Sequence, residues 1–242
     1  MFRAVAAGRQ LHFENAGVVG GNEVFKDDET GSRWQQSSLE AISGPLQGQH
    51  VELFPFLLTD WQEWHRLHPD TLVLKPLPGY ADRIAAKNEQ IRQGLSGEGP
   101  APNGVLRTDD RLKPKTMILG LDVHDESKAF PLPVLRDLRV INDRLGGQAV
   151  LIVHQPSSDT TTAFLSQVNG RTLTFAAANA SAEATELTDG QTHSRWDAYG
   201  LCVSGPLRGS RLRSVILEPE YWFAWSEFHP NTAIYAAAAP KH

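Results

Sequence analysis

The chain has 242 residues and a mass of 26.7 kDa, which suits one large domain or two small ones. Its 28 acidic and 23 basic residues leave no basic surface of the size that phosphate backbones require, so we expect no nucleic-acid partner. No apolar run approaches the roughly 20 residues that cross a bilayer, and residues 1–9 lack an apolar signal core. We therefore expect no membrane span and, by default, a cytoplasmic protein. The single cysteine, Cys202, excludes an internal disulfide and a metal site built from several cysteines.

The most informative feature of the sequence is that it repeats itself at an offset of about 162 residues. One repeated set is Asp27, Ser32, Arg33 and Trp34, which recur as Asp189, Ser194, Arg195 and Trp196. Another is Trp61, Trp64, His68, Pro69 and Thr71, which recur as Trp222, Trp225, His229, Pro230 and Thr232. These matches predict an internally duplicated unit of roughly 70 residues. We place a first unit, with its front part missing, at residues 1–74, a connector at 75–116 and a second, more complete unit at 117–242.

Short strands and one helix are predicted in the first unit. Glycine turns followed by alternating apolar residues predict paired strands around Leu11 and Phe13. The apolar run 51–58 lies between turn residues and predicts a core strand. Asp60 then caps a helix over residues 61–67, which Pro69 ends. Residues 71–74 favour β structure, so we expect them to rejoin the sheet.

The rest of the chain divides into a connector and a second set of strands. A polar helix is predicted over residues 80–93, followed by a turn-rich segment. Strands are predicted at 117–123, 128–132 and 149–153, with a short helix at 133–138. The elements of the first unit then return as a core strand at 212–217, a helix at 220–228 and a strand at 232–235. The predicted fold class is mainly β (α+β): two tandem curved sheets or partly open barrels, each with one tryptophan-bearing helix, related by a pseudo-twofold.

Arg33 and Trp34, with their repeats Arg195 and Trp196, are the first candidate pocket residues. An arginine beside an aromatic wall can clamp a carboxylate or a phosphate. In the alternative interpretation, Asp27 pairs with Arg33 across a hairpin while Trp34 fills the core. Both copies keep this set although they differ at most positions. A shared requirement of the fold explains that better than two identical active sites.

Histidines near the two helices are the second candidate group. His65 and His68 stand three residues apart, a spacing that can bring two imidazoles to one metal ion. The second unit has Ser226 in place of His65, and no acidic residue stands at a zinc-like interval, so we expect no metal site. His68 and His229 instead suit the carbonyl end of each helix, where a partly charged imidazole is favourable.

A polar cluster and the cysteine complete the candidates. Asp122, His124, Asp125 and Glu126 can act as an acid and a base, but they also suit an ordinary turn between two strands, which we favour. Cys202 matches Ala41 of the other copy and predicts a small core residue rather than a nucleophile. The sequence contains no common catalytic signature.

The chain resembles the DUF3179 family of uncharacterised bacterial and archaeal proteins over nearly its whole length. The resemblance lies in residues 29–34 (ETGSRW), 44–46 (GPL), 64–74 (WHRLHPDTLVL), 128–132 (KAFPL) and 222–235 (WFAWSEFHPNTAIY). It implies a missing front, because family members carry a Cys-Pro-x-Cys motif, in some of them with selenocysteine, before the segment that matches residues 2–13. In the second unit the matching place is held by Gln155, Pro156 and Ser158, so the proline is present and the cysteines are absent.

Two functions follow as expectations. If the family motif lies upstream of Met1, the protein handles redox chemistry or a metal, and Arg33, Trp34 and the first helix frame its pocket. In the alternative, it is a non-catalytic module that binds a small ligand or a protein in the cleft between the units. The sequence names no cofactor or substrate. An incomplete first unit exposes a sheet edge, so we also expect self-association.

Overall fold

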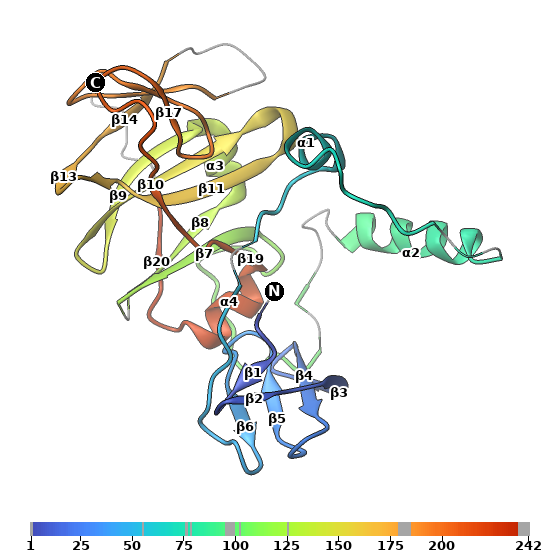
Figure 1. The fold of residues 1–242 in the computed structure, drawn as a ribbon. Coiled ribbons are helices and arrows are strands. Elements are labelled where there is room, and N and C mark those ends of the chain that lie inside the picture. Colours follow the sequence, from blue (N-terminus) through green and yellow to red (C-terminus); the bar gives the residue numbers. More distant parts are fainter. Residues whose placement is uncertain are drawn as a thin grey trace.

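The computed structural model describes residues 2–54, 56–75, 77, 79–94, 100–101, 103–124, 126–178 and 185–236. Most of its elements are strands in antiparallel sheets, so the predicted mainly β class is confirmed. Figure 1 shows a small N-terminal sheet unit, a larger body and helix α2 (Ala81–Gly94), which reaches away from both. Among the described residues, no helix is long and apolar enough to cross a bilayer.

The N-terminal unit is an antiparallel sheet in the order β3-β4-β5-β6, preceded by the hairpin β1-β2. Its strands are β1 (Val5–Ala6), β2 (Arg9–Gln10), β3 (Phe13–Val19), β4 (Asn22–Asp27), β5 (Arg33–Gln35) and β6 (Ala41–Ser43). A small core holds it together, in which Leu11 and Trp34 are buried with Ala41 and Val51. This unit is thus built around one tryptophan.

The larger body contains two four-stranded sheets that share one core. The first has the order β19-β7-β8-β20 and comprises β7 (Met117–Val123), β8 (Glu126–Pro131), β19 (Glu218–Tyr221) and β20 (Ala233–Ile234). The second has the order β18-β11-β10-β9 and comprises β9 (Val140–Leu145), β10 (Gln148–Gln155), β11 (Thr160–Leu165) and β18 (Arg213–Val215). Helix α3 (Leu132–Leu138) buries Leu135 in the same core.

Strand β10 lies at the centre of the body because both of its faces are apolar. Val150 and Ile152 pack in the core between the two sheets, and the alternating Leu151 and Val153 pack in a second core. The second core is closed by β12 (Gln167–Val168), β13 (Arg171–Thr172), β14 (Phe175–Ala177), β15 (Leu187–Asp189), β16 (Arg195–Trp196) and β17 (Cys202–Ser204). A strand that is buried on both faces reads as a continuous apolar run.

Helices α1 (Trp61–Leu67) and α4 (Trp222–Phe228) have the same length. Both end at a histidine whose backbone N–H donates to the carbonyl of a tryptophan four residues earlier. Asp60 caps α1, as predicted, by accepting a hydrogen bond from the N–H of Glu63 at 2.7 Å. Figure 1 shows α4 between the body and the N-terminal unit, whereas α1 lies at the side of the body.

Three predicted elements were wrong. Residues 51–58 form no core strand: Leu53 makes an isolated bridge, and residues 56–58 turn their apolar side chains to a pocket. Residues 71–74 do not rejoin a sheet, and Leu72 is 95% exposed. The last helix begins at Trp222 rather than at residue 220, because the residues before it pair with β7 as strand β19.

Candidate functional site

In each repeated set the aspartate, the serine and the tryptophan belong to one hydrogen-bond network, which also includes a threonine. The indole N–H of Trp34 donates to Asp27 Oδ2 at 2.8 Å, and that of Trp196 donates to Asp189 Oδ2 at 3.0 Å. Burial raises the pKa of both carboxyls, but these bonds and those from neighbouring threonines lower it below the ordinary value. The expected pairing of Asp27 with Arg33 is therefore wrong, because the indole occupies the carboxylate.

The arginines of these sets lie at the surface. Arg33 donates to the carbonyl of Ala16 at 2.9 Å, and Arg195 pairs with Glu186. Trp34 and Trp196 fill the cores of their sheets. The structure thus places each arginine and its tryptophan apart, one outside and one inside.

Each of the histidine rings at the two helices packs beside a tryptophan ring, and only that of His229 is stacked on it. The ring of His68 lies 4.2 Å from that of Trp64, and the ring of His229 lies 3.7 Å from that of Trp225, while His65 packs on Trp61. Among the described residues, no three His, Cys, Asp or Glu side chains gather closely enough to hold a metal ion.

The backbone of His229 closes its helix, but its imidazole is not charged there. Its N–H donates to the carbonyl of Trp225 at 2.8 Å. Burial lowers the pKa of His229 to about 4 and raises the pKa of Asp122, 3.7 Å away, to about 6. Near neutral pH the imidazole is thus neutral, and the predicted charge interaction at the helix end is wrong for His229.

The polar cluster at the turn between β7 and β8 forms hydrogen bonds to a neighbouring turn at Gly146. His124 Nδ1 lies 3.0 Å from the carbonyl oxygen of Gly146, and Glu126 accepts a hydrogen bond from the N–H of Gly146 at 3.0 Å. Asp125 lies outside the described residues. These bonds tie two β turns together, as the turn interpretation expects.

Cys202 is a core residue. It packs against Trp196 and Leu187 in the second core, and burial raises the pKa of its thiol. A protonated, enclosed thiol is a poor nucleophile.

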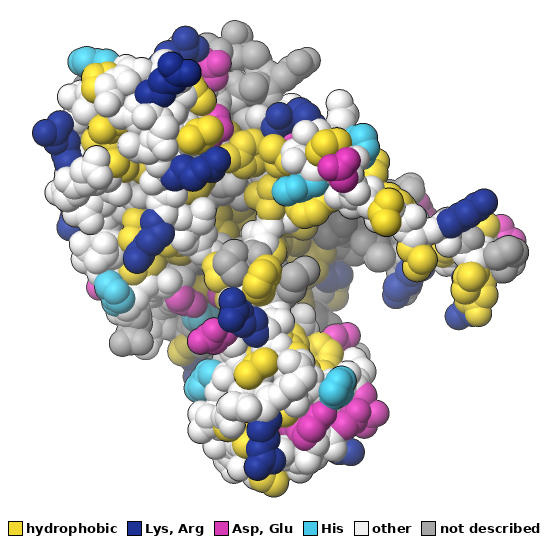
Figure 2. All heavy atoms as spheres, in the orientation of Figure 1, with side chains coloured by type: hydrophobic (Ala, Val, Ile, Leu, Met, Phe, Trp, Pro, Cys, Tyr) yellow, Lys and Arg dark blue, Asp and Glu magenta, His cyan; other side chains and the backbone are white. Residues whose placement is uncertain are grey.

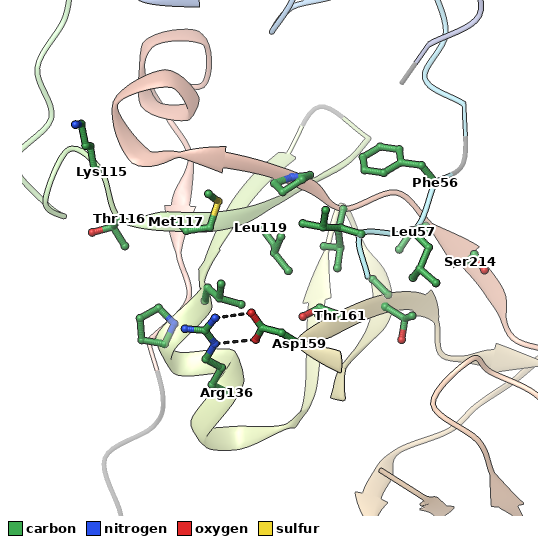
Figure 3. A pocket seen from close by; sticks show the side chains of 18 residues that line it. Phe56, Leu57, Lys115, Thr116, Met117, Leu119, Arg136, Asp159, Thr161 and Ser214 are labelled. Carbon is green, nitrogen blue, oxygen red and sulfur yellow. Dashed lines mark hydrogen bonds and ion pairs between the residues drawn. The ribbon is translucent and has the colours of Figure 1, made fainter. Parts of the chain in front are cut away.

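A pocket with a volume of about 550 Å³ lies in the larger body (Figure 3). Most of its lining is apolar: Phe56, Leu57, Leu58, Met117, Leu119, Leu132, Pro133, Ala163, Val215, Leu217 and Pro219. These residues come from the segment before α1, from β7, α3, β11 and β18, and from the chain around β19. The pocket therefore exists only where segments distant in the sequence meet.

An ion pair and Lys115 supply the charged part of the pocket wall. Arg136 Nε donates to Asp159 Oδ1 at 2.8 Å, and Arg136 Nη2 donates to Asp159 Oδ2. Both side chains keep contact with solvent, at 52% and 49% exposure. The buried His154 has its Nε2 3.6 Å from Asp159, and burial lowers its pKa, so it is neutral near pH 7. In Figure 3 this pair faces Leu119, with Phe56 and Leu57 on another wall.

Gln155, Pro156 and Ser158, candidates from the sequence, lie beside this pocket. Pro156 and Ser158 belong to a 3-10 turn between β10 and β11, and Asp159 of the wall follows directly. Ser158 Oγ lies 2.7 Å from Thr160 Oγ1, which donates to Thr59 Oγ1 at 2.7 Å. Gln155 is buried and accepts a hydrogen bond from the N–H of Thr185. The hydrogen bond between Thr160 and Thr59 thus connects the segment before α1 to the edge of the pocket.

A second polar group lies where the N-terminal unit meets the body. Glu218 and Glu220 of β19 and Asp122 of β7 share one face of their sheet, as the strand register requires. Ser37 of the N-terminal unit donates to both oxygens of Glu220, at 3.1 and 3.2 Å. Burial raises the pKa of Glu218 and of Glu220 to about 7. We call these four residues the acidic seam.

The comparison with protein families fits the residues described above. The model described as "Protein of unknown function (DUF3179)" matches residues 1–232. The chain belongs to the DUF3179 family. No curated protein and no solved structure matches it. The predicted family is thus confirmed, and in this DUF3179 chain the segment at 155–158 stands next to the pocket.

The sequence reasoning missed the principal residues of the pocket. Arg136 lies in the predicted short helix 133–138, where nothing marks it as a binding residue. Residues 56–58 lie in the predicted core strand 51–58, which places their side chains in a core rather than in a pocket. Asp159 had one available signal, since it directly follows the candidate residues Gln155, Pro156 and Ser158. Nothing in the sequence pairs it with Arg136, 23 residues earlier.

Proposed function

We propose that this DUF3179 chain binds a small, mostly apolar molecule whose polar end accepts hydrogen bonds from Arg136. The observation that carries the proposal is the cavity of about 550 Å³, whose lining is mostly apolar and includes one ion pair. Ligand sites typically have volumes of roughly 300–1,000 Å³ and combine apolar walls with a few polar groups that orient the ligand.

The state of the ion pair favours an acceptor on the ligand over a donor. Both carboxylate oxygens of Asp159 already accept hydrogen bonds from Arg136. Arg136 Nη1, in contrast, makes no hydrogen bond with any described residue, so it keeps donors for a further partner. A ligand carboxylate can therefore share the guanidinium without displacing Asp159.

The test uses 8-anilinonaphthalene-1-sulfonate, which combines an apolar body with an anionic end. We expect its titration into the labelled chain to shift the amide NMR signals of residues 161–163, 117–119 and 214–217. Arg136→Gln weakens this binding, and Val215→Trp fills the cavity and abolishes it. Matched controls are Arg195→Gln, which removes an arginine that also pairs with an acid, and Val203→Trp, on a strand away from the pocket.

Two results would contradict the proposal. One is a set of shifts confined to the exposed apolar residues 72–74. The other is an equal loss of binding in Val203→Trp and Val215→Trp, because only Val215 lines the pocket.

We also infer that the chain contains an internal duplication, with units at 1–74 and 117–242 and a connector at 75–116. The matching bonds of Trp34 to Asp27 and of Trp196 to Asp189 support this, as do the similar ends of α1 and α4. The redox or metal-handling function has no such support, and among the described residues no three His, Cys, Asp or Glu side chains could hold a metal ion.

A further inference from the structure

Helix α1 and helix α4 have the same internal contacts. The indole N–H of Trp64 donates to Thr71 Oγ1 at 3.0 Å, and that of Trp225 donates to Thr232 Oγ1 at the same distance. In both helices a histidine ring packs against this tryptophan, tilted in α1 and stacked in α4. Each helix therefore presents its tryptophans and the chain that follows in a similar arrangement.

The two helices differ in what covers them. Trp222 and Trp225 are fully buried, whereas Trp61 is 53% exposed. After α1, Leu72 and Leu74 are 95% and 93% exposed. Figure 2 shows hydrophobic side chains gathered around α1 and along the chain that leads to α2. Several large apolar side chains in one place mark an interaction surface rather than a scatter of single exposed residues.

The cover of α4 is the hairpin β7-β8. Trp225 lies directly on Gly120 of β7, where an added Cβ would come within 2.2 Å of the indole. Ile118 and Ala129 of the hairpin pack with the two tryptophans. Beyond the helix, β20 runs parallel to β8, with Ile234 opposite Ala129. The hairpin thus offers a glycine to the tryptophan and a strand edge to the following segment.

We propose that α1 and residues 71–74 dock an apolar β-hairpin of a partner polypeptide. A glycine of that hairpin lies against Trp64, and one of its strands runs parallel to residues 71–74. The backbone of residues 71–74, which pairs with no described strand, can supply hydrogen bonds for strand addition, and the exposed leucines supply apolar contacts. This inference is independent of the ligand proposed for the pocket.

The structure argues against a second copy of the chain as the occupant. In each copy the hairpin β7-β8 is already paired on both edges, with β19 and β20. Its Gly120 is covered by Trp225 of the same chain. The hairpin of a second copy cannot cover α1 without leaving its own helix, so a separate polypeptide with a free hairpin is the better fit.

The experiment supplies such a hairpin as a synthetic peptide with the sequence of residues 117–131. Calorimetric titration into the full chain is expected to show binding of one peptide per chain. A matched peptide with Gly120→Val is expected to bind at least about tenfold more weakly, because its added side chain meets Trp64. The chain variant Leu72→Glu/Leu74→Glu is expected to lose binding to a similar extent. Val18→Glu is the control, since Val18 is 63% exposed on another strand.

Three results would overturn the inference. The first is failure of the 117–131 peptide to bind the unmodified chain. The second is equal binding of the Gly120→Val peptide, which would show that no indole faces that position. The third is a concentration-dependent dimer in sedimentation that Leu72→Glu/Leu74→Glu dissociates, which would make a second copy the occupant. Unchanged circular dichroism of the variants verifies that these exposed substitutions leave the fold intact.

Discussion

The carboxyls of the acidic seam are expected to contribute less stability as the pH rises from about 4.5 to 7. Glu218 and Glu220 have pKa values near 7 in the folded chain, chiefly because of burial, against an ordinary value of 4.5. A pKa that folding raises means that the folded state binds the proton more tightly than the unfolded state. Their contribution is fully present below about pH 4.5, falls between pH 4.5 and 7, and is lost above pH 7.

The magnitude follows from the shift. Moving from 4.5 to about 7 corresponds to about 3 kcal/mol for each carboxyl, at 1.36 kcal/mol per pKa unit. Both side chains keep some contact with solvent, which screens the charge, so we expect about 2 kcal/mol for each. Asp122, whose pKa burial raises to about 6, acts in the same direction.

The perturbation is Glu218→Gln/Glu220→Gln, which keeps the shape of both side chains and removes their charge. At pH 8 we expect the double variant to be more stable than the unmodified chain by roughly 2–4 kcal/mol. Between pH 5 and 8 its free energy of unfolding is expected to vary less with pH. Urea unfolding followed by tryptophan fluorescence at four pH values in this range measures both effects. Glu52→Gln, at an exposed position, is the matched control and is expected to leave the profile unchanged.

A profile of the double variant parallel to that of the unmodified chain would refute this reasoning. It would mean that the two carboxylates reach water in the folded state as freely as in the unfolded state. His229 and His154, whose pKa values burial lowers, act in the opposite direction below about pH 6.5, but both chains contain them, so their effect cancels in the comparison. The hydrogen-bonded Asp27 and Asp189 have lowered pKa values and so lose their contribution only below the chosen range.

Two further predictions concern the packing of the body. Gly120→Ala places a methyl group against the ring of Trp225 and is expected to lower the free energy of unfolding in urea by about 1–3 kcal/mol. The control Gly190→Ala, where the nearest atom to the added methyl is a threonine hydroxyl at 3.2 Å, is expected to cost less. Equal losses would show that the indole moves aside freely. The thiol of Cys202 is expected to resist labelling by 5,5′-dithiobis(2-nitrobenzoate) in the folded chain, because the side chain is buried and its pKa is raised. It is expected to react fully once guanidinium unfolds the chain. Rapid labelling of the folded chain would contradict the assignment of Cys202 to the core.

Local signals in the sequence predicted those elements that depend on local physics. Asp60 indicated the start of α1, because a capping carboxylate accepts hydrogen bonds only from the next few backbone N–H groups. The continuous apolar run of β10 indicated a buried strand for a similarly local reason, since its residues alternate between two faces that are both covered. The same kind of signal misled at residues 51–58 and 71–74. Their apolar side chains fitted strands, but no described strand edge continues beside them as a ladder.

The sequence by itself determined the family, the mainly β class and the burial of Trp34 and Trp196, because these depend on residue types and on spacings along the chain. Only the tertiary structure decided the pocket, the acidic seam and the difference between the two helices. Arg136 meets Asp159, and Ser37 meets Glu220, through folding of segments whose separation carries no periodic signal. Trp61 and Trp222 are the same residue type in the same local pattern, yet one is half exposed and the other is buried, because only Trp222 has a hairpin packed against it.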